Sequence, residues 1–203
     1  MSSEPGAGHW LRDFIKKTKD EYDYIFVDCN PSFSIYTQVA LAAVQRLVIP
    51  VMADDSSRRA IQNAFSLVYG LKLPSEIYAQ HMFATRIKAG GLDLPQVHLL
   101  IKNRLTQYMG PASGYAAVLK AMDSDILGLI KENKSLLTFN TLNKGTEEIR
   151  DFQTTGVVAF ARGTPFYRLK PGKLMVQGKR VAVDAAQIKT RKDEIHTLAM
   201  RMQ

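Results

Sequence analysis

The sequence predicts an α/β fold in three layers, with a mostly parallel sheet flanked by helices and a small β-hairpin near the C-terminus. Short apolar runs of strand length alternate with segments in which apolar residues recur at helical spacing. This alternation is typical of a parallel sheet that is covered on both faces. Two β-rich runs around Gln177-Gly178 predict the hairpin. The 203 residues are enough for one ordinary domain, and we find no linker that would divide them.

The first part of the chain is expected to alternate helix, strand, helix, strand, helix. The helices are indicated by periodic apolar residues and by serine or aspartate residues suited to N-capping. The strands are indicated by uninterrupted apolar runs. The expected segments are a helix over 8–19, a strand over 24–27 that ends at Asp28, a helix over 35–45, a strand over 46–52 and a helix over 54–71.

The remainder continues the pattern and then changes to a hairpin. An extra helix is expected before Gly90-Gly91 and Pro95, where glycine and proline end helical structure. A polar, glycine-bearing loop over 102–114 follows the third strand. The expected segments are a helix within 73–95, strands over 97–101 and 136–142, a helix within 115–133, the hairpin over 173–183 and a final helix over 184–202.

Composition excludes several classes of protein and places the charge at one end. Hydrophobic residues make up 46% and charged residues 23%, which are globular values. A single cysteine, Cys29, cannot form an internal disulfide, and no apolar run has the roughly 20 residues that span a bilayer. From Gly156 to Gln203 there are ten Lys/Arg and three Asp/Glu, so the basic excess lies almost wholly in the last quarter. Such a surface attracts polyanions, although it could also be a solvated face without a ligand.

The segment "YDYIFVDCNPS" (Tyr22 to Ser32) is the first candidate site. Its apolar run leads directly into Asp28 and a turn-prone cluster. In P-loop NTPases an aspartate that follows a buried strand helps to hold Mg²⁺ against the β- and γ-phosphates. Many buried strands end in aspartate, so the motif alone favours a structural role for Asp28, as a helix cap or a loop hydrogen-bond acceptor.

The longer pattern resembles the ParA/Soj/MinD family of deviant-Walker ATPases. "YDYIFVDCNPS", a helix, and then "RLVIPVMADDSSRRAIQNAFSLV" occur in that family's order and at similar spacing. The resemblance is strongest from Tyr22 to Leu71, and it extends to the strand ending near Arg104. More loosely, "GTEEIRDFQTTGVV" and the terminal "DEIHTLAMRM" resemble the family's C-terminal segments. The resemblance implies a partial P-loop NTPase fold.

The resemblance assigns roles to individual residues. It implies that Asp28 is catalytic and contacts nucleotide and Mg²⁺, directly or through water. Pro31 matches the second proline of the family's turn and so belongs to the nucleotide site, whereas Asn30 stands where a first proline is usual. Asn103 would lie near the adenine base, the alternative being a surface loop. Asp54 and Asp55 follow the next strand, where the alternative is capping of a helix.

One family feature is missing from these residues. The sequence contains no K-G-G-x-x-K-[ST] loop, whose backbone N–H groups and lysine hold the phosphates of ATP. We therefore expect residues 1–203 to be a single unit, the C-terminal part of a ParA-like domain, which uses ATP and Mg²⁺ only in the full-length protein. The alternative is a naturally short module of the same fold that binds DNA or dimerises without nucleotide.

The resemblance also implies partners. A ParA-type protein is expected to be a cytoplasmic, nucleoid-associated homodimer that binds DNA without sequence preference, is stimulated by a ParB-like centromere-binding protein and has no membrane contact. The basic C-terminal region fits the DNA expectation, because Lys and Arg neutralise phosphates and release counterions. The candidate DNA contacts are Lys144, Arg150, Lys170, Lys173, Lys179, Arg180, Lys189, Arg191 and Lys192.

Other kinds of site have little support in the sequence. The histidines are scattered without metal-ligand spacing, and one cysteine makes a zinc site improbable. His98, within an apolar run, is expected to be a histidine whose hydrogen bonds are satisfied at the core or the sheet edge. The final helix has a narrow apolar stripe interrupted by Asp193 and Glu194, which favours packing on the protein over binding to a membrane.

Overall fold

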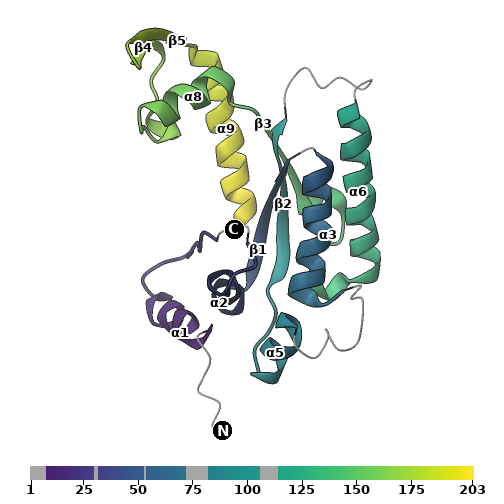
Figure 1. Cartoon of the computed structure of the whole chain (residues 1–203). Coiled ribbons are helices and arrows are strands. Elements are labelled where there is room, and N and C mark those ends of the chain that lie inside the picture. Colours follow the sequence, from purple (N-terminus) through teal and green to yellow (C-terminus); the bar gives the residue numbers. More distant parts are fainter. Residues whose placement is uncertain (1–7, 30–31, 53, 72–81, 106–113) are drawn as a thin grey trace.

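The computed structural model describes residues 8–29, 32–52, 54–71, 82–105 and 114–203 (Figure 1). Helices and strands alternate along most of this length. In chain order the elements are α1 (Gly8–Thr18), α2 (Ile35–Ala43), β1 (Arg46–Met52), α3 (Asp55–Tyr69), α5 (Phe83–Ala89), β2 (Gln96–Leu105), α6 (Gly114–Glu132), η1 (Lys134–Leu136), α7 (Leu142–Gly145), β3 (Thr146–Arg150), α8 (Gln153–Ala161), η2 (Phe166–Arg168), β4 (Gly172–Val176), β5 (Lys179–Val183) and α9 (Ala185–Met202).

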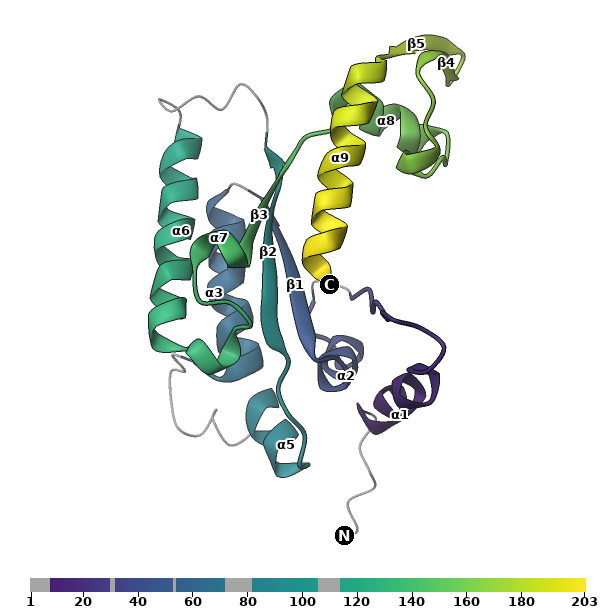
Figure 2. The same ribbon diagram turned by 180° about the vertical axis from the view of Figure 1, so that it is seen from behind.

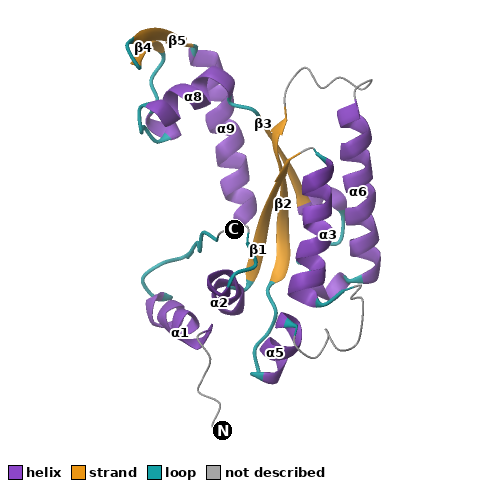
Figure 3. Ribbon diagram, in the orientation of Figure 1, coloured by secondary structure: helices purple, strands orange, loops and turns teal. Residues whose placement is uncertain are grey.

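The described strands form two sheets, and the expected fold class is confirmed. Strands β1, β2 and β3 make a parallel sheet in that order, and β4 and β5 make an antiparallel hairpin (Figure 3). The views from the front and from behind show α3 and α6 on one face of the parallel sheet and α9 on the other (Figures 1 and 2). The sheet is therefore the middle layer of three.

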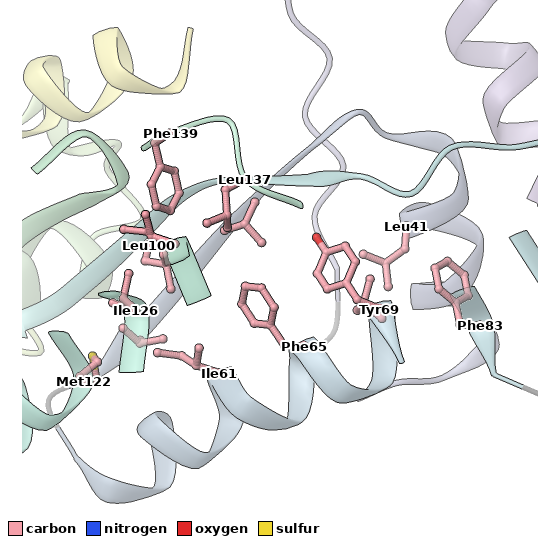
Figure 4. Close-up of a cluster of buried hydrophobic side chains, with 14 of the residues drawn as sticks. Leu41, Ile61, Phe65, Tyr69, Phe83, Leu100, Met122, Ile126, Leu137 and Phe139 are labelled. Atoms are coloured by element: carbon pink, nitrogen blue, oxygen red, sulfur yellow. The ribbon is translucent and has the colours of Figure 1, made fainter. Parts of the chain in front are cut away.

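The main core lies between the sheet and the helices α3 and α6. Its side chains alternate with the strand pleat, so that Leu100 of β2 meets Ile61 of α3 and Ile126 of α6 in one apolar cluster (Figure 4). Leu99 and Ile101 point to the opposite face, in a smaller cluster that also contacts α9. Since β2 is buried on both faces, it is the central strand of the described sheet.

His98 marks an irregularity in β2. The register with β1 shifts between Leu47 and Val48, whose partners are Val97 and Leu99, so His98 has no partner on β1. Its ring Nε2 lies 3.0 Å from the carbonyl oxygen of Arg201, and Nδ1 lies 2.7 Å from the hydroxyl of Thr138. Both ring nitrogens therefore have partners, and the expectation of a satisfied histidine is confirmed.

Local capping explains where several helices begin. Ser34, Asp54 and Asp184 have extended backbone conformations, and each accepts a hydrogen bond from the backbone N–H three residues later. The helix α3 ends at Gly70, whose φ of 72° places it in the left-handed region that glycine adopts without strain. These caps agree with the helix starts expected from serine and aspartate.

Two expected strands are wrong. Residues 24–29 are irregular, and Phe26 is 73% exposed. A strand requires a backbone partner, and among the described strands the only neighbour of β1 is β2. Residues 136–142 instead hold the end of η1, a single bridge from Leu137 to Val97 and the start of α7. The third strand of the sheet is Thr146–Arg150, whose single buried apolar residue, Ile149, gives a weak strand signal.

The C-terminal lobe, residues 153–192, has a small core of its own. Val158 of α8, Val183 of β5 and Ile188 of α9 are buried together in it. The hairpin turns at Gln177 and Gly178, both with positive φ, which is the geometry of a tight two-residue hairpin loop. Figure 1 shows this lobe at one end of α9, away from the sheet. No helix in the described parts of the chain is long and apolar enough to cross a membrane.

Candidate functional site

Asp28 lies in a pocket next to α1 and α2, not at the end of a strand. The pocket has a volume of about 310 Å³, and residues of α1, α2 and the segment between them line it. Asp28 itself is exposed. The lining is mostly apolar: Trp10, Leu11, Val27, Cys29, Ile35, Tyr36, Thr37, Val39 and Ala40 complete it. Asn30 and Pro31, the other residues of this predicted site, lie outside the described residues.

The pocket does not fit a magnesium–nucleotide complex by itself. Among the described residues, no lysine or arginine lines it, and no three His, Cys, Asp or Glu side chains could hold one metal ion. Partial burial raises the pKa of the Cys29 thiol, and the neighbouring Asp28 carboxylate raises it further. A thiol with a raised pKa is largely neutral at pH 7, so Cys29 is not an activated nucleophile. A role of Asp28 in Mg²⁺ binding would require further metal ligands from residues outside this pocket.

Asn103 lies near the carboxyl end of β2. It is opposite Met52 in the sheet register, and its side-chain oxygen accepts a hydrogen bond from the backbone N–H of Arg104 at 2.9 Å. Arg104 has a φ of 58°, an unusual value for a residue other than glycine. Asn103 does not line the pocket that contains Asp28. The two predicted nucleotide residues therefore do not share this pocket.

Lys102 is the buried ionic group that the sequence analysis missed. Its side chain is 4% exposed, and its Nζ lies 2.6 Å from Asp123 Oδ1 of α6 and 3.4 Å from Glu148 Oε1 of β3. The ion pairs join the central strand to a helix and to its neighbouring strand. The sequence does show that a lysine directly follows an apolar run of strand length. If such a strand is central, the lysine is buried and needs an acidic partner, because an unpaired buried charge is unfavourable.

Asp54 has a structural role. Its Oδ1 accepts a hydrogen bond of 2.6 Å from the backbone N–H of Ser57, and the Ser57 hydroxyl in turn accepts one of 3.1 Å from the backbone N–H of Met52. These contacts close the turn between β1 and α3. The capping alternative for Asp54 is therefore confirmed.

The predicted DNA-binding residues fall into two groups. Seven lie in or next to the hairpin and on α9, all within the C-terminal lobe, and six of these seven, all except Arg191, are exposed or half-buried. Lys170, Lys173, Lys179 and Arg180 are exposed, and none of them forms an ion pair with another described residue. Lys189 is exposed and Lys192 is half-buried. The lobe therefore carries a group of accessible cations that form no ion pair with another described residue.

The other three predicted contacts have different surroundings. Arg191 is buried, its Nη1 donates to both carboxylate oxygens of Glu194, at 2.8 and 2.9 Å, and its guanidinium lies over the ring of Phe152. The positive charge of Arg191 is therefore paired with Glu194 within the protein. Arg150, at the end of β3, lies 4.0 Å from Glu194. Lys144 is exposed on α7, where its carbonyl oxygen accepts a hydrogen bond from Arg201.

Comparison with known proteins gives matches to partition proteins. An AAA-domain family model matches residues 2–74. The chromosome partitioning protein ParA of Myxococcus xanthus is 43% identical over 44 residues, which is 22% of this chain and 16% of that protein. The cell division protein PomZ of the same organism is 32% identical over 73 residues, covering 36% of this chain and 23% of PomZ. The chromosome-partitioning ATPase Soj of Treponema pallidum is 38% identical over 45 residues, covering 22% of this chain and 18% of Soj.

These matches cover less than a quarter of the length of each of these relatives. No solved structure matches the chain. The family model begins before α1 and extends past the end of α3. It therefore includes the apolar run over residues 24–27, the strand β1 and the helix capped by Asp54. Over residues 2–74, the chain is similar to ParA/Soj-type partition ATPases.

Proposed function

We propose that these residues are the C-terminal part of a ParA-type ATPase that segregates plasmid or chromosomal DNA. The observation that carries the proposal is the group of exposed cations on and beside the hairpin, which form no ion pair with another described residue, in a chain whose residues 2–74 match the partition family. Four of them, Lys170, Lys173, Lys179 and Arg180, project from one small lobe. A surface of this kind binds the phosphate backbone of DNA without reading its sequence.

The ATP site of this proposal is formed jointly with a glycine-rich loop and lysine outside the 203 residues. The support is the free edge of β1, which has no described partner on the side away from β2. A parallel strand added there would end at the same edge of the sheet as Met52 and Asn103. Ligands of open α/β sheets bind at this edge. The added strand would also provide the backbone partner that residues 24–27 lack.

The remaining parts of the proposal follow from the family. The full-length protein is a homodimer in its ATP-bound state, it associates with the nucleoid in the cytoplasm, and a ParB-like centromere-binding protein stimulates its ATP hydrolysis. Residues 1–203 alone bind neither ATP nor Mg²⁺ tightly. The apolar lining of the pocket around Asp28 supports this last point.

The DNA contacts are tested by reversing two charges of the hairpin. The double variant Lys179→Glu/Arg180→Glu should lose most of its affinity for a random-sequence duplex. The slope of log Kd against log salt concentration should decrease by the amount expected for the loss of about two to four phosphate contacts. Fluorescence anisotropy at two salt concentrations measures both quantities. Lys16→Glu/Lys17→Glu on α1 makes the same change in net charge away from the lobe. Equal losses in the two variants would contradict a DNA surface on the hairpin.

The catalytic role of Asp28 requires the full-length protein. Asp28→Ala should reduce DNA-stimulated ATP hydrolysis by about two orders of magnitude or more, because a Mg²⁺ ligand acts on the transferred phosphoryl group. Asp54→Ala, which removes a helix cap, should lower stability and leave the rate per folded molecule unchanged. Full activity of Asp28→Ala would show that this carboxylate has no metal role.

The second candidate function is a module that binds DNA or dimerises without nucleotide. The exposed position of Asp28 in an apolar pocket favours it. Calorimetric titration with ATP and Mg²⁺ separates the two candidates. A full-length protein that binds ATP supports the ATPase, whereas one that binds DNA in the absence of any nucleotide binding supports the module.

A further inference from the structure

The outward face of α8 is apolar and uncharged. Val158 and Ala159 are buried in the core of the lobe, whereas Val157 is 64% exposed and Phe160 is 90% exposed. Thr154, Val157 and Phe160 follow at intervals of three residues, which places them along one side of the helix. The nine residues of α8 include no charged side chain, although the solvent face of a surface helix is normally polar. We call Val157 and Phe160 the apolar stripe of α8.

The lobe has two further exposed side chains with large apolar parts, Met175 on β4 and Tyr167 on η2. Arg162 follows the helix, and its Nη1 donates a hydrogen bond of 3.0 Å to the carbonyl oxygen of Met175. This contact holds β4, with the half-exposed Met175, next to the C-terminal end of the stripe. Tyr167 on η2 is also exposed, and the guanidinium of Arg168 lies 5.3 Å from the centre of its ring. Two exposed side chains with large apolar parts, Met175 and Tyr167, therefore each have an arginine next to them.

The charge of the lobe limits what could cover the stripe. Residues 153–192 contain nine Lys/Arg and one Asp/Glu. A second lobe docked on the first would bring two strongly positive surfaces together, which is unfavourable. A DNA backbone would satisfy the cations, but contacts with phosphates bury little of an apolar stripe. An amphipathic helix with acidic flanks satisfies both requirements, because its apolar face covers Val157 and Phe160 and its carboxylates face the arginines.

We propose that the apolar stripe of α8 is a docking site for an acidic amphipathic helix of a partner protein, with Phe160 as its central anchor and Arg162 and Arg168 as its charged rim. This surface is distinct from the hairpin cations to which the DNA contacts are assigned. The two surfaces belong to one lobe, so a partner bound at α8 would add negative charge near the DNA-binding group. Its binding should therefore weaken the affinity of the protein for DNA.

The test uses the full-length protein and three synthetic peptides of about 20 residues. The first forms an amphipathic helix with leucine at i, i+3, i+4 and i+7 and glutamate on the remaining faces. The second has the same composition in scrambled order, and the third has lysine in place of glutamate. Fluorescence anisotropy should show binding of the first, weaker binding of the second and none of the third. Phe160→Ser should weaken the first interaction about tenfold or more, as expected for an aromatic anchor.

The controls separate docking from folding and from DNA binding. Met200→Ser on α9 removes a comparably apolar, half-exposed side chain outside the lobe and should leave peptide affinity unchanged. Phe160→Ser should retain the circular dichroism spectrum and, within about twofold, the duplex affinity of the unaltered protein, because Phe160 contributes no charge to phosphate binding. Failure of the acidic helix to bind, equal binding of the lysine peptide, or a loss of duplex affinity in Phe160→Ser as large as in Lys179→Glu/Arg180→Glu would overturn the proposal.

Discussion

Two apolar runs of this chain look alike in sequence and differ in structure. Arg46–Met52 forms β1, which pairs with β2 over its whole length. Residues 24–27, one helix earlier, are equally apolar but irregular, and Phe26 is largely exposed. The difference is the partner, because an apolar run becomes a strand only where another backbone completes its hydrogen bonds. The edge of β1 away from β2 has no partner among the described strands.

The largest effect on stability is expected in the central strand of the described sheet, which has a neighbouring strand on each side and buried apolar side chains. Leu100→Ala in β2 should lower the free energy of unfolding by about 2–5 kcal/mol, because it leaves a cavity in a core that cannot fully collapse. Leu127→Ala on α6 removes the same atoms from a side chain that is 44% exposed and should cost less than about 1 kcal/mol. Urea unfolding curves measure both. Similar losses would mean that the described sheet is not the stable centre of the molecule.

The next largest effect is expected at the buried lysine. Asp123→Asn leaves Lys102 with only the more exposed Glu148 as an anionic partner and should cost about 2–3 kcal/mol. The matched control is Asp125→Asn, two residues along the same helix, whose ion pair with Arg58 is partly solvated and should contribute less than about 1 kcal/mol. Chemical denaturation at neutral pH compares the two variants. If Asp123→Asn cost no more than its control, the buried pair would not stabilise the joint between β2 and α6.

A smaller effect is expected where α3 meets the start of β2. The hydroxyl of Tyr69 donates a hydrogen bond of 2.7 Å to the carbonyl oxygen of Pro95, and Tyr69→Phe should cost about 1 kcal/mol. Burial raises the pKa of Tyr69, so the unfolded chain ionises first as the pH rises above about 10. The stability due to this group is therefore lost above pH 10. Thermal melts at pH 7 and pH 10.5 should show a smaller decrease for Tyr69→Phe than for the parent protein.

The smallest effect on stability is expected at Phe26, in the apolar run that is irregular. Phe26→Ala should change the stability of residues 1–203 by less than about 0.5 kcal/mol, because its side chain is exposed. In the full-length protein, where we propose that residues 24–27 join the sheet, the same substitution should cost about 3 kcal/mol or more. Denaturation of both lengths gives the two values. Equal small losses would show that the run stays outside the sheet in both.

Much of the fold was predictable because its signals are local. The caps at Ser34 and Asp54, the strand Arg46–Met52 and the hairpin around Gly178 each depend on a few adjacent residues. The strand Thr146–Arg150 was missed because three of its five residues are charged, and its place beside β2 is decided by contacts distant in sequence. The same reason explains why the sequence could not show that Lys102 meets Asp123 and Glu148.

By itself, the sequence determined the α/β class, the similarity of residues 2–74 to partition ATPases and the concentration of positive charge in the last quarter of the chain. These follow from periodicity, adjacent motifs and composition, which need no knowledge of distant contacts. Only the tertiary structure decided which apolar run pairs with a neighbour, which cations stay exposed, and that Arg191 turns inward to Glu194. Pairing, burial and exposure depend on which segments meet in space, and that is a property of the folded chain.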